Sequence, residues 1–319
     1  MKMRIVYVLI SRGSDYYTEQ MMLSIYSLMK FNPEMEITIV CDVETRDLLY
    51  GNDFISSNPL ITIHTEEFEE HIELKTRSRF LKTSLREIIN GDFLFIDTDT
   101  VICGSLSDIY NMPYNLAMVY DCNQTKMVEP TDAAIVDRCR KINPSVNVIG
   151  TPYYNSGVIL ARDTKAVHDF YTLWHNNWKI SLASGLNLDQ PALCVTNNQT
   201  QFKIARLDDS WNCQCKYRTS VKDARIIHYF NPSADIQHSE SPLAFLLYDE
   251  IRSNGFKSEY INKLIVNRPE ILCILLQIKK DAFGQYCSSP LIDVYFKNRR
   301  LFRMLETTAG RIMRFIYDR

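Results

Sequence analysis

The chain has 319 residues, of which 46% are apolar, enough to bury the core of one large domain or of one domain with an appendage. Its formal net charge of −2 argues against a nucleic-acid-binding protein, because such proteins are normally basic. Nine cysteines are too few for a disulfide scaffold at this length, and their spacing does not repeat as paired zinc knuckles. The composition therefore predicts a globular protein with reduced thiols.

The first ten residues contain an apolar run that is similar to a short signal peptide. The run is only about six residues long and lacks a small-residue cleavage site, so a buried strand over Ile5–Ile10 fits it better. No stretch approaches the roughly 18 uninterrupted apolar residues that a membrane span needs. We therefore expect a cytoplasmic protein.

The next segments alternate between the patterns of helices and strands. The apolar residues from Thr18 to Phe31 recur at helical spacing, which predicts a helix. Two strands are predicted after it, at Glu36–Val40 and Leu60–His64. A second helix is predicted over Arg77–Ile89 and is closed by Asn90-Gly91, a typical helix stop.

A continuous apolar run, Phe93–Ile96, has the pattern of a strand that is covered on both faces. Strands separated by helical crossovers imply an α/β fold with a doubly wound, mostly parallel central sheet. Ligands of such sheets gather where the strands end at their carboxyl edge. The residues directly after Ile96 are therefore the first candidates for a functional site.

The second half of the chain has a mixed pattern. A strand is predicted at Gly157–Ala161, a helix at Val167–Trp178 and another buried strand at Ala224–His228. From Pro242 onward the composition becomes helical. We therefore predict a main domain over residues 1–235 and a helical C-terminal region over residues 236–319.

Two carboxylates directly follow the buried strand, in Asp97-Thr98-Asp99. Side chains at i and i+2 where a strand ends can be aimed at one point in front of the sheet. Such a pair of hard oxygen ligands suits Mg²⁺ or Mn²⁺ and leaves coordination positions free for diphosphate oxygens. The bound cation would neutralise the charge that develops on a leaving nucleoside diphosphate.

The stretch from Phe93 to Val101 resembles the Asp-x-Asp segment of GT-A glycosyltransferases, specifically the family-8 group that includes glycogenin and bacterial lipooligosaccharide galactosyltransferases. Four further segments resemble those of the family in the expected order: Asp15–Tyr17, Tyr153–Leu160, Leu188–Leu193 and Ile226–Tyr229. The resemblance implies a Rossmann-like GT-A catalytic domain and a UDP-sugar donor. It also implies transfer of a hexose to a glycan, a lipid-linked acceptor or a protein.

By this resemblance, Asp97, Asp99 and His228 are the metal ligands. An imidazole beside carboxylates favours Mn²⁺ over Mg²⁺, which prefers an all-oxygen shell. Thr98, between the two aspartates, is grouped with them among the residues that bind the donor.

The resemblance assigns further residues to the nucleotide of the donor. Tyr17 falls where the family places an aromatic ring against uracil, and a π-face suits a flat base. Asp15 is a second candidate for a contact with the base or the ribose. Arg79 corresponds to a basic residue that reaches the donor in the family, with Arg77 and Lys82 as alternatives.

Asn155, Asp189 and Gln190 are implied to face the donor sugar. The small pair Ser156-Gly157 is expected to let the backbone approach a ligand closely. Transfer in the family retains the anomeric configuration, either through a weak nucleophile or through attack by the acceptor on the same face. Asp189 or Gln190 would lie on that face under either route, so both are catalytic candidates.

The segment after His228 departs from the family pattern. Family members typically continue to a glycine and then to a lysine that meets the diphosphate, whereas the corresponding residues here are Asn231 and Ala234. The candidates to supply the lost positive charge are Lys222, Arg225 and His238.

Basic and apolar residues interleave over residues 296–316. One interpretation is an amphipathic, cationic helix that makes peripheral contact with the inner face of an anionic membrane, which would suit a lipid-linked acceptor. The other is a helix docked on the catalytic domain with its basic face in solvent. The run Ile271–Ile278 is too short to span a bilayer.

Two other functions remain open. Asp97–Val101 also satisfies the signature of haloacid-dehalogenase-type phosphatases, whose first aspartate is phosphorylated, and Asp208-Asp209 imitates their later metal carboxylates. That signature normally follows the first strand of its domain, whereas several elements precede it here. The second alternative is a non-catalytic nucleotide-sugar-binding protein, which the missing lysine supports.

Overall fold

A computed structural model describes residues 3–124, 126–200, 202–214, 223–229, 242–257, 261 and 298–317. The chain divides into two compact units, Met1–Cys273 and Ile274–Arg319. The boundary after residue 235 that the sequence suggests stays a prediction. Of the residues singled out in the sequence, Lys222, Asn231, Ala234, His238 and the run Ile271–Ile278 lie outside the described residues.

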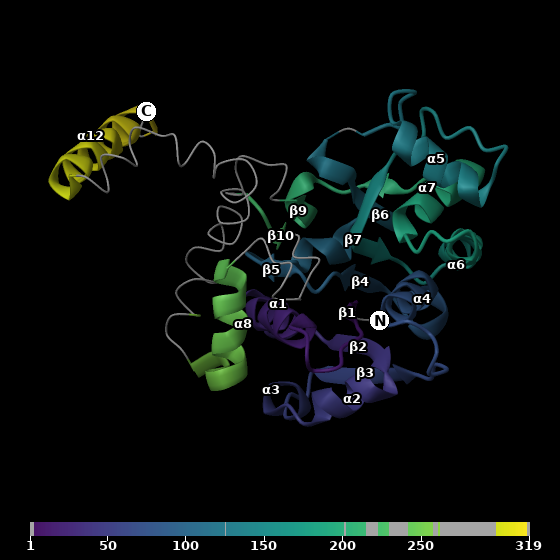
Figure 1. The fold of residues 1–319 in the computed structure, drawn as a ribbon, viewed down its shortest axis with the longest axis horizontal. Coiled ribbons are helices and arrows are strands. Elements are labelled where there is room, and N and C mark those ends of the chain that lie inside the picture. The colour runs from purple at the N-terminus through teal and green to yellow at the C-terminus, as the bar shows by residue number, and fades with distance from the viewer. Residues whose placement is uncertain are drawn as a thin grey trace. The chain divides into compact units, whose positions relative to one another are not determined.

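The centre of the first unit is a seven-stranded sheet with the order β3-β2-β1-β4-β7-β6-β8 (Figure 1). Its strands are β1 Arg4–Leu9, β2 Ile37–Asp42, β3 Ile61–Glu66, β4 Phe93–Ile96, β6 Leu116–Tyr120, β7 Tyr154–Ala161 and β8 Ala205–Arg206. Only β7 runs antiparallel to its two neighbours, β4 and β6, and the other pairs are parallel. The predicted α/β fold with a mostly parallel central sheet is confirmed.

Helices cover both faces of this sheet (Figure 1). The α-helices among the described residues of the first unit are α1 Tyr17–Phe31, α2 Val43–Tyr50, α3 Asp53–Ser56, α4 Leu74–Ile88, α5 Ala133–Ile142, α6 Lys165–Ala183, α7 Asp189–Gln199 and α8 Pro242–Asn254. Alternate residues of β1 face opposite layers. The hydroxyl of Tyr7 lies 3.0 Å from that of Ser24 in α1, whereas Val6 and Val8 belong to the core cluster that includes Leu81 of α4.

Most predicted elements have bounds in the structure that differ by one or more residues, and three of them show why. Helix α4 begins three residues before the predicted Arg77, because the amide of Arg77 already donates to the carbonyl of Glu73. Strand β7 begins at Tyr154 instead of Gly157, since β6 pairs with this earlier part of the strand. The strand predicted at Ala224–His228 is shorter, β10 Ile226–His228.

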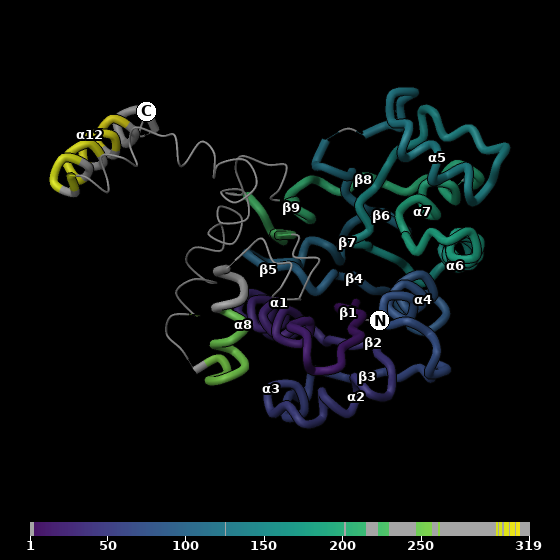
Figure 2. The backbone as a smooth tube through the Cα atoms, in the orientation of Figure 1, coloured from purple at the N-terminus to yellow at the C-terminus, as the bar shows by residue number. Residues whose placement is uncertain are grey.

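A second, three-stranded sheet has the order β5-β10-β9, with β5 at Thr100–Ile102 and β9 at Cys213–Gln214. Strand β5 follows β4 after only three residues and lies beside α1 (Figure 2). Strand β10 pairs with β5 in antiparallel register, which sets His228 opposite Thr100. This register brings a residue from late in the chain to the carboxyl end of β4.

The second unit contributes one described helix, α12 Arg299–Tyr317. The first two residues of the predicted basic and apolar segment, 296 and 297, lie outside the described residues. Among the described helices, none has the length and hydrophobicity required to cross a membrane.

Candidate functional site

The turn between β4 and β5 consists of Asp97, Thr98 and Asp99. Its backbone is held at two points, because the amide of Asp97 donates to the carbonyl of Gly157 at 2.8 Å and the hydroxyl of Thr100 donates to the carbonyl of Asp97 at 2.8 Å. The hydroxyl of Thr98 donates to the side chain of Gln20 in α1 at 2.8 Å. The turn is therefore fixed on the sheet and on the helix beneath it.

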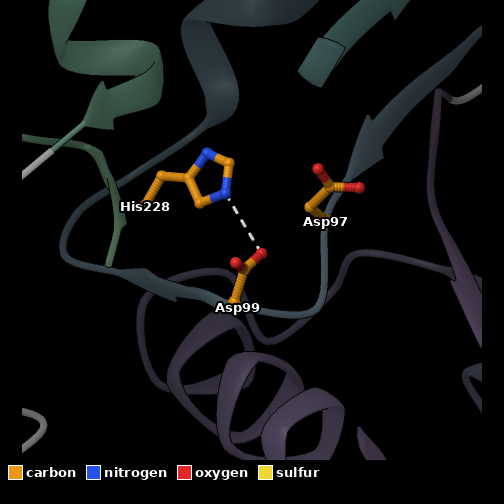
Figure 3. Close-up of side chains that lie close together, drawn as sticks. All are labelled: Asp97, Asp99 and His228. Carbon is orange, nitrogen blue, oxygen red and sulfur yellow. Dashed lines mark ion pairs between the residues drawn. The ribbon is translucent and has the colours of Figure 1, made fainter. Parts of the chain in front are cut away.

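His228 meets this turn from β10 (Figure 3). Its Nε2 lies 3.1 Å from Oδ1 of Asp99, and one ligand atom each from Asp97, Asp99 and His228 lies within 4.8 Å of the others. Two carboxylates and an imidazole that converge in this way can share one divalent cation. The structure thus brings together the three residues that the sequence suggests as metal ligands.

A hydrogen bond on the far side of the ring orients His228. Its Nδ1 lies 3.0 Å from Oδ1 of Asn212, the last residue of the 3-10 helix Asp209–Asn212. The acceptor oxygen requires Nδ1 to carry the proton, which leaves Nε2 as the ligand atom in the neutral ring. Burial acts to lower the pKa of His228. The neighbouring carboxylate of Asp99 acts to raise it and outweighs burial, so the pKa of His228 is raised.

The imidazole of His228 rests against Gly157 of β7. A Cβ atom added at Gly157 would lie 2.5 Å from Cε1 and 2.7 Å from Nδ1 of His228, and 2.9 Å from Oδ1 of Asn155. We expected this glycine to let the backbone approach a ligand. In the structure the group that approaches Gly157 closely is the imidazole of His228, and the approach of a ligand stays a prediction.

Asp189 begins α7 and is buried beside two cations. Its carboxylate lies 3.2 Å from Nε of Arg79 and 3.5 Å from Nζ of Lys82, and it accepts a hydrogen bond of 2.7 Å from Ser156. Burial alone would raise the pKa of Asp189, but the two cations and the hydrogen bond lower it well below its usual range. Asp189 is therefore a fixed negative charge at neutral pH.

Of the three basic residues that the sequence offers in α4, two reach this site. The ammonium group of Lys82 lies 3.0 Å and 3.2 Å from the two oxygens of Asp97, so Lys82 links Asp97 with Asp189. The pKa of Arg79 is raised, most strongly by the carboxylate of Asp189, with which it pairs. The guanidinium of Arg77 instead pairs with Asp42 at the end of β2.

Asp121 joins the site and was missed in the sequence. Its Oδ1 accepts from the side-chain amide of Asn155 at 3.1 Å and from that of Gln190 at 3.4 Å. The other end of the Asn155 side chain, Oδ1, accepts from the amide of Gly157 and from Asn212. Asp121 directly follows the apolar strand β6, just as Asp97 follows β4, and this repeated pattern could have identified it.

Asp15 and Tyr17 lie where the chain passes from β1 to α1. The two carboxylate oxygens of Asp15 accept from the hydroxyl of Ser11 at 2.7 Å and from the amides of Arg12 and Tyr17 at 3.1 Å and 3.0 Å. Asp15 therefore shapes the turn that presents Tyr17. Tyr17 is half-buried at the first turn of α1, and its predicted contact with the base stays a prediction.

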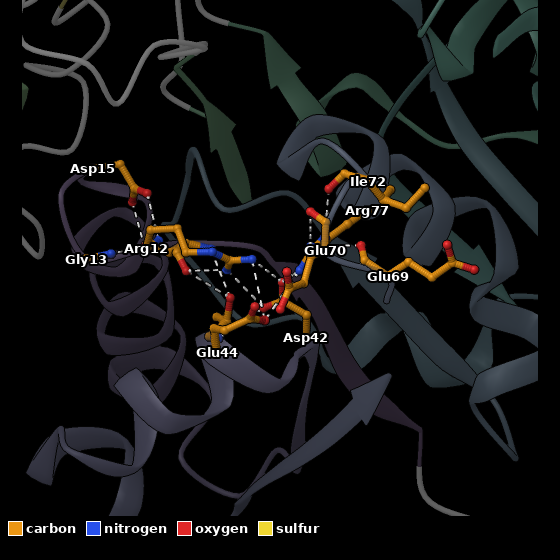
Figure 4. Close-up of polar contacts among 11 residues, drawn as sticks. Arg12, Gly13, Asp15, Asp42, Glu44, Glu69, Glu70, Ile72 and Arg77 are labelled. Atoms are coloured by element: carbon orange, nitrogen blue, oxygen red, sulfur yellow. Dashed lines mark hydrogen bonds and ion pairs between the residues drawn. The ribbon is translucent and has the colours of Figure 1, made fainter. Parts of the chain in front are cut away.

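A cluster of ion pairs supports the same turn (Figure 4). Asp42, at the end of β2, is paired with Arg12 at 2.7 Å and with Arg77 at 2.9 Å, while Arg77 also donates to the carbonyls of Glu69, Glu70 and Ile72. These contacts tie the turn after β1 to the loop before α4. A cavity of about 340 Å³ lies beside the cluster, lined by Arg12, Glu44, Glu70, His71, Ile72, Glu73, Leu74 and Arg77.

Arg225 is the described member of the three candidates to replace the missing lysine. Its guanidinium pairs with Asp108 at 2.6 Å, donates to the carbonyl of Ser105 at 2.8 Å and stacks on Trp211. None of these partners belongs to the candidate site, so Arg225 is held away from it.

A mostly parallel sheet whose β4 strand leads into an Asp-x-Asp turn, with a histidine beside it, is the arrangement of a GT-A glycosyltransferase. Residues 8–233, more than half of the chain, match Glycosyl transferase family 8, and the chain belongs to that family. It is accordingly a glycosyltransferase by class. No curated protein sequence matches the chain.

Solved structures with a similar fold include two glycosyltransferases. Mouse xyloside xylosyltransferase 1, in its apo form, matches with a TM-score of 0.50 and 11% identity over 73% of this chain and 98% of its own. The glycosyltransferase GlyE of Streptococcus pneumoniae TIGR4 matches with a TM-score of 0.51 and 15% identity over 78% of this chain and 60% of its own. At these identities the likeness is one of fold.

The contact between Gly157 and His228 predicts the effect of a single methyl group. Gly157→Ala forces the imidazole or the strand to move, and we expect it to lower the free energy of unfolding by about 1–3 kcal/mol. Gly104→Ala is the matched control, because a Cβ atom there meets no atom within 4 Å. Denaturant unfolding of both variants measures the difference, and equal stabilities would contradict the close packing of His228.

Proposed function

We propose that the protein is a hexosyltransferase that depends on a divalent cation and uses a UDP-sugar donor, with retention of the anomeric configuration. The convergence of Asp97, Asp99 and His228 on one point carries this proposal. The buried, ionised Asp189 nearby supplies a second group of the kind that glycosyl transfer needs. Membership of Glycosyl transferase family 8 supports the same conclusion.

The donor set fits Mn²⁺ in particular, because Nε2 of His228 is oriented as a ligand by Asn212 and lies beside two carboxylates. When bound, the cation supplies Lewis-acid neutralisation of the charge on the leaving diphosphate. Thr98 keeps the turn that carries both aspartates against α1. Lys82 already pairs with Asp97 and adds positive charge at the same place.

The nucleotide would be held between the turn after β1 and helix α4. Tyr17 offers an aromatic face to the uracil base, and Asp15 presents Tyr17 by bonding its backbone amide. Arg79, whose guanidinium pairs with Asp189, would meet the ribose or the phosphates of the donor.

Asp189 and Gln190 would face the donor sugar. Glycosyl transfer develops positive charge at the anomeric carbon, and the preorganised carboxylate of Asp189 stabilises such charge. Gln190 donates to Asp121 and to the carbonyl of Tyr154, which fixes its amide beside Asp189. Two routes would retain the anomeric configuration: a weak nucleophile on the protein, or attack by the acceptor on the same face of the sugar. Asp189 or Gln190 would lie on that face in either route.

The phosphatase alternative has no support in the structure. Asp97 follows β4, the central strand, and not the first strand of the domain. The carboxylate of Asp208 accepts from the amide of Ser210 and that of Asp209 pairs with Arg206, so both carboxylates serve the local structure.

Turnover tests the proposed function. With a panel of UDP-sugars and Mn²⁺, we expect UDP release by the wild-type protein, loss of release in EDTA, and recovery with added Mn²⁺. Asp99→Asn should lower kcat/KM by about a hundredfold or more, since it removes a group that neutralises charge in the transition state.

Asp169→Asn is the matched control, because Asp169 is exposed on α6 and pairs only with Lys165 in the contacts described. Its kcat/KM should equal that of the wild-type protein. UDP release that persists unchanged in Asp99→Asn rejects the proposed site. Binding of UDP-sugars without turnover would indicate a non-catalytic nucleotide-sugar-binding protein.

We further propose that α12 rests on the inner, cytoplasmic face of an anionic membrane and thereby places the enzyme near a lipid-linked acceptor. Apolar and basic side chains occupy opposite sides of this helix. Leu301, Met304, Leu305 and Ile312 are exposed apolar residues on one side, whereas Arg300, Arg303 and Arg311 are exposed on the other. An apolar face with a cationic border matches the chemistry of anionic lipid headgroups.

Vesicle sedimentation tests this placement. The full chain should bind vesicles of phosphatidylcholine and phosphatidylglycerol and bind phosphatidylcholine alone much more weakly. Ile312→Glu should reduce binding about tenfold or more, because it puts a charge on the apolar side. Thr307→Glu, with the same change of charge on the polar side, should reduce it less. Equal losses in the two variants, or no binding by the wild-type protein, would favour a helix docked on the enzyme itself.

A further inference from the structure

Helix α8 lies beyond residues 8–233, the part of the chain that matches the family, and packs on α1. Its Tyr248 is fully buried, with 0% of its surface exposed. The phenol oxygen of Tyr248 lies 2.9 Å from the hydroxyl of Tyr229 and accepts a long hydrogen bond of 3.4 Å from Nε2 of Gln20. One hydroxyl therefore connects α8 with α1 and with the residue that follows His228.

Both partners of Tyr248 lead directly to the Asp-x-Asp turn. Gln20 uses its other side-chain atom, Oε1, to accept from the hydroxyl of Thr98 at 2.8 Å. The amide of Tyr229 donates to the backbone carbonyl of Asp99 at 3.1 Å. The contacts thus form a closed loop of hydrogen bonds. It runs from Tyr248 to Gln20, from Gln20 to Thr98, along the turn to Asp99, from Asp99 to Tyr229, and back to Tyr248.

The position of α8 is itself fixed near the proposed nucleotide site. Tyr16 stacks on Tyr248 with ring centroids 5.8 Å apart, and its hydroxyl donates to Asp249 at 2.5 Å. Arg252 pairs with Glu19 at 2.7 Å and donates to the backbone carbonyl of Asp15 at 2.5 Å. These contacts lie on either side of Tyr17, so α8 holds both the turn after β1 and the first turn of α1.

We propose that α8 completes the donor site and that Tyr248 is a positioning residue for the divalent cation. This inference rests on the proposed function. The loop of hydrogen bonds fixes the turn that carries Asp97 and Asp99 relative to the strand that carries His228. Without the Tyr248 hydroxyl, the buried amide of Gln20 and hydroxyl of Tyr229 lose a partner and the ligands become less well placed.

The test is a titration of each protein with Mn²⁺, followed by the paramagnetic signal of the free ion. Tyr248→Phe removes one oxygen atom and should weaken Mn²⁺ binding by up to about tenfold, the lower end of the effect of removing a direct partner of a metal ligand, because Tyr248 acts through Gln20 and Tyr229. Tyr171→Phe is the matched control, because Tyr171 is equally buried and its hydroxyl has no hydrogen-bond partner among the described residues. The control should bind Mn²⁺ as the wild-type protein does.

A second variant keeps the test decisive should Tyr248→Phe fold poorly. Gln20→Met retains the shape of the side chain but removes the hydrogen bonds to Thr98 and Tyr248, and it should also weaken Mn²⁺ binding. Because the two residues act in one loop, the loss of Mn²⁺ affinity in the double variant should be smaller than the product of the two single-variant losses.

The outcomes separate this inference from the proposed function. Wild-type protein that binds no Mn²⁺ defeats the cation site as a whole. Wild-type binding that is matched by Tyr248→Phe and by Gln20→Met overturns the role of α8 and leaves the cation site intact. Losses that multiply in the double variant would overturn the closed loop.

Discussion

The antiparallel register of β5 and β10 is the constraint on which the site depends. It sets His228 opposite Thr100, one residue beyond Asp99, and leaves Nε2 of the imidazole 3.1 Å from the Asp99 carboxylate. The three candidate ligands come from sequence positions far apart, yet short strands and a three-residue turn leave little freedom in their relative positions. Gly157 completes the arrangement, because only a residue without a Cβ atom fits beneath the ring.

Charge explains why the arrangement suits a divalent cation. Asp97, Asp99, Asp121 and Asp189 gather on a few adjoining elements, and the cations described among them are Lys82 and Arg79. The excess of carboxylates over cations leaves negative charge that a divalent ion would balance. The pKa of Asp99 is lowered: burial acts to raise it, but the partner His228 outweighs that effect. The pairing of Asp99 with His228 thus offsets the cost of burying the Asp99 carboxylate.

The sequence alone predicted strands β1 to β4 and β7 and helices α1, α4 and α6, because each has a local apolar pattern. The three candidate ligands came from the resemblance of short segments to those of the family. The sequence did not predict the residues that act through pairing between distant elements. Asp121 depends on β6 lying against β7, Asn212 on a 3-10 helix that meets His228, and Tyr248 on the packing of α8. The sequence also could not tell which basic residues of α4 reach the site. Lys82 and Arg79 pair with its aspartates, whereas Arg77 pairs with Asp42.

The most direct measurement is the position of the cation itself. Crystals grown with Mn²⁺ and UDP, measured at the manganese absorption edge, reveal the ion by its anomalous scattering. The account predicts one strong peak within ligand distance of Asp97, Asp99 and His228, with the diphosphate on its open side. Ordered UDP without a manganese peak among these three side chains, or a peak bound elsewhere on the chain, would contradict it.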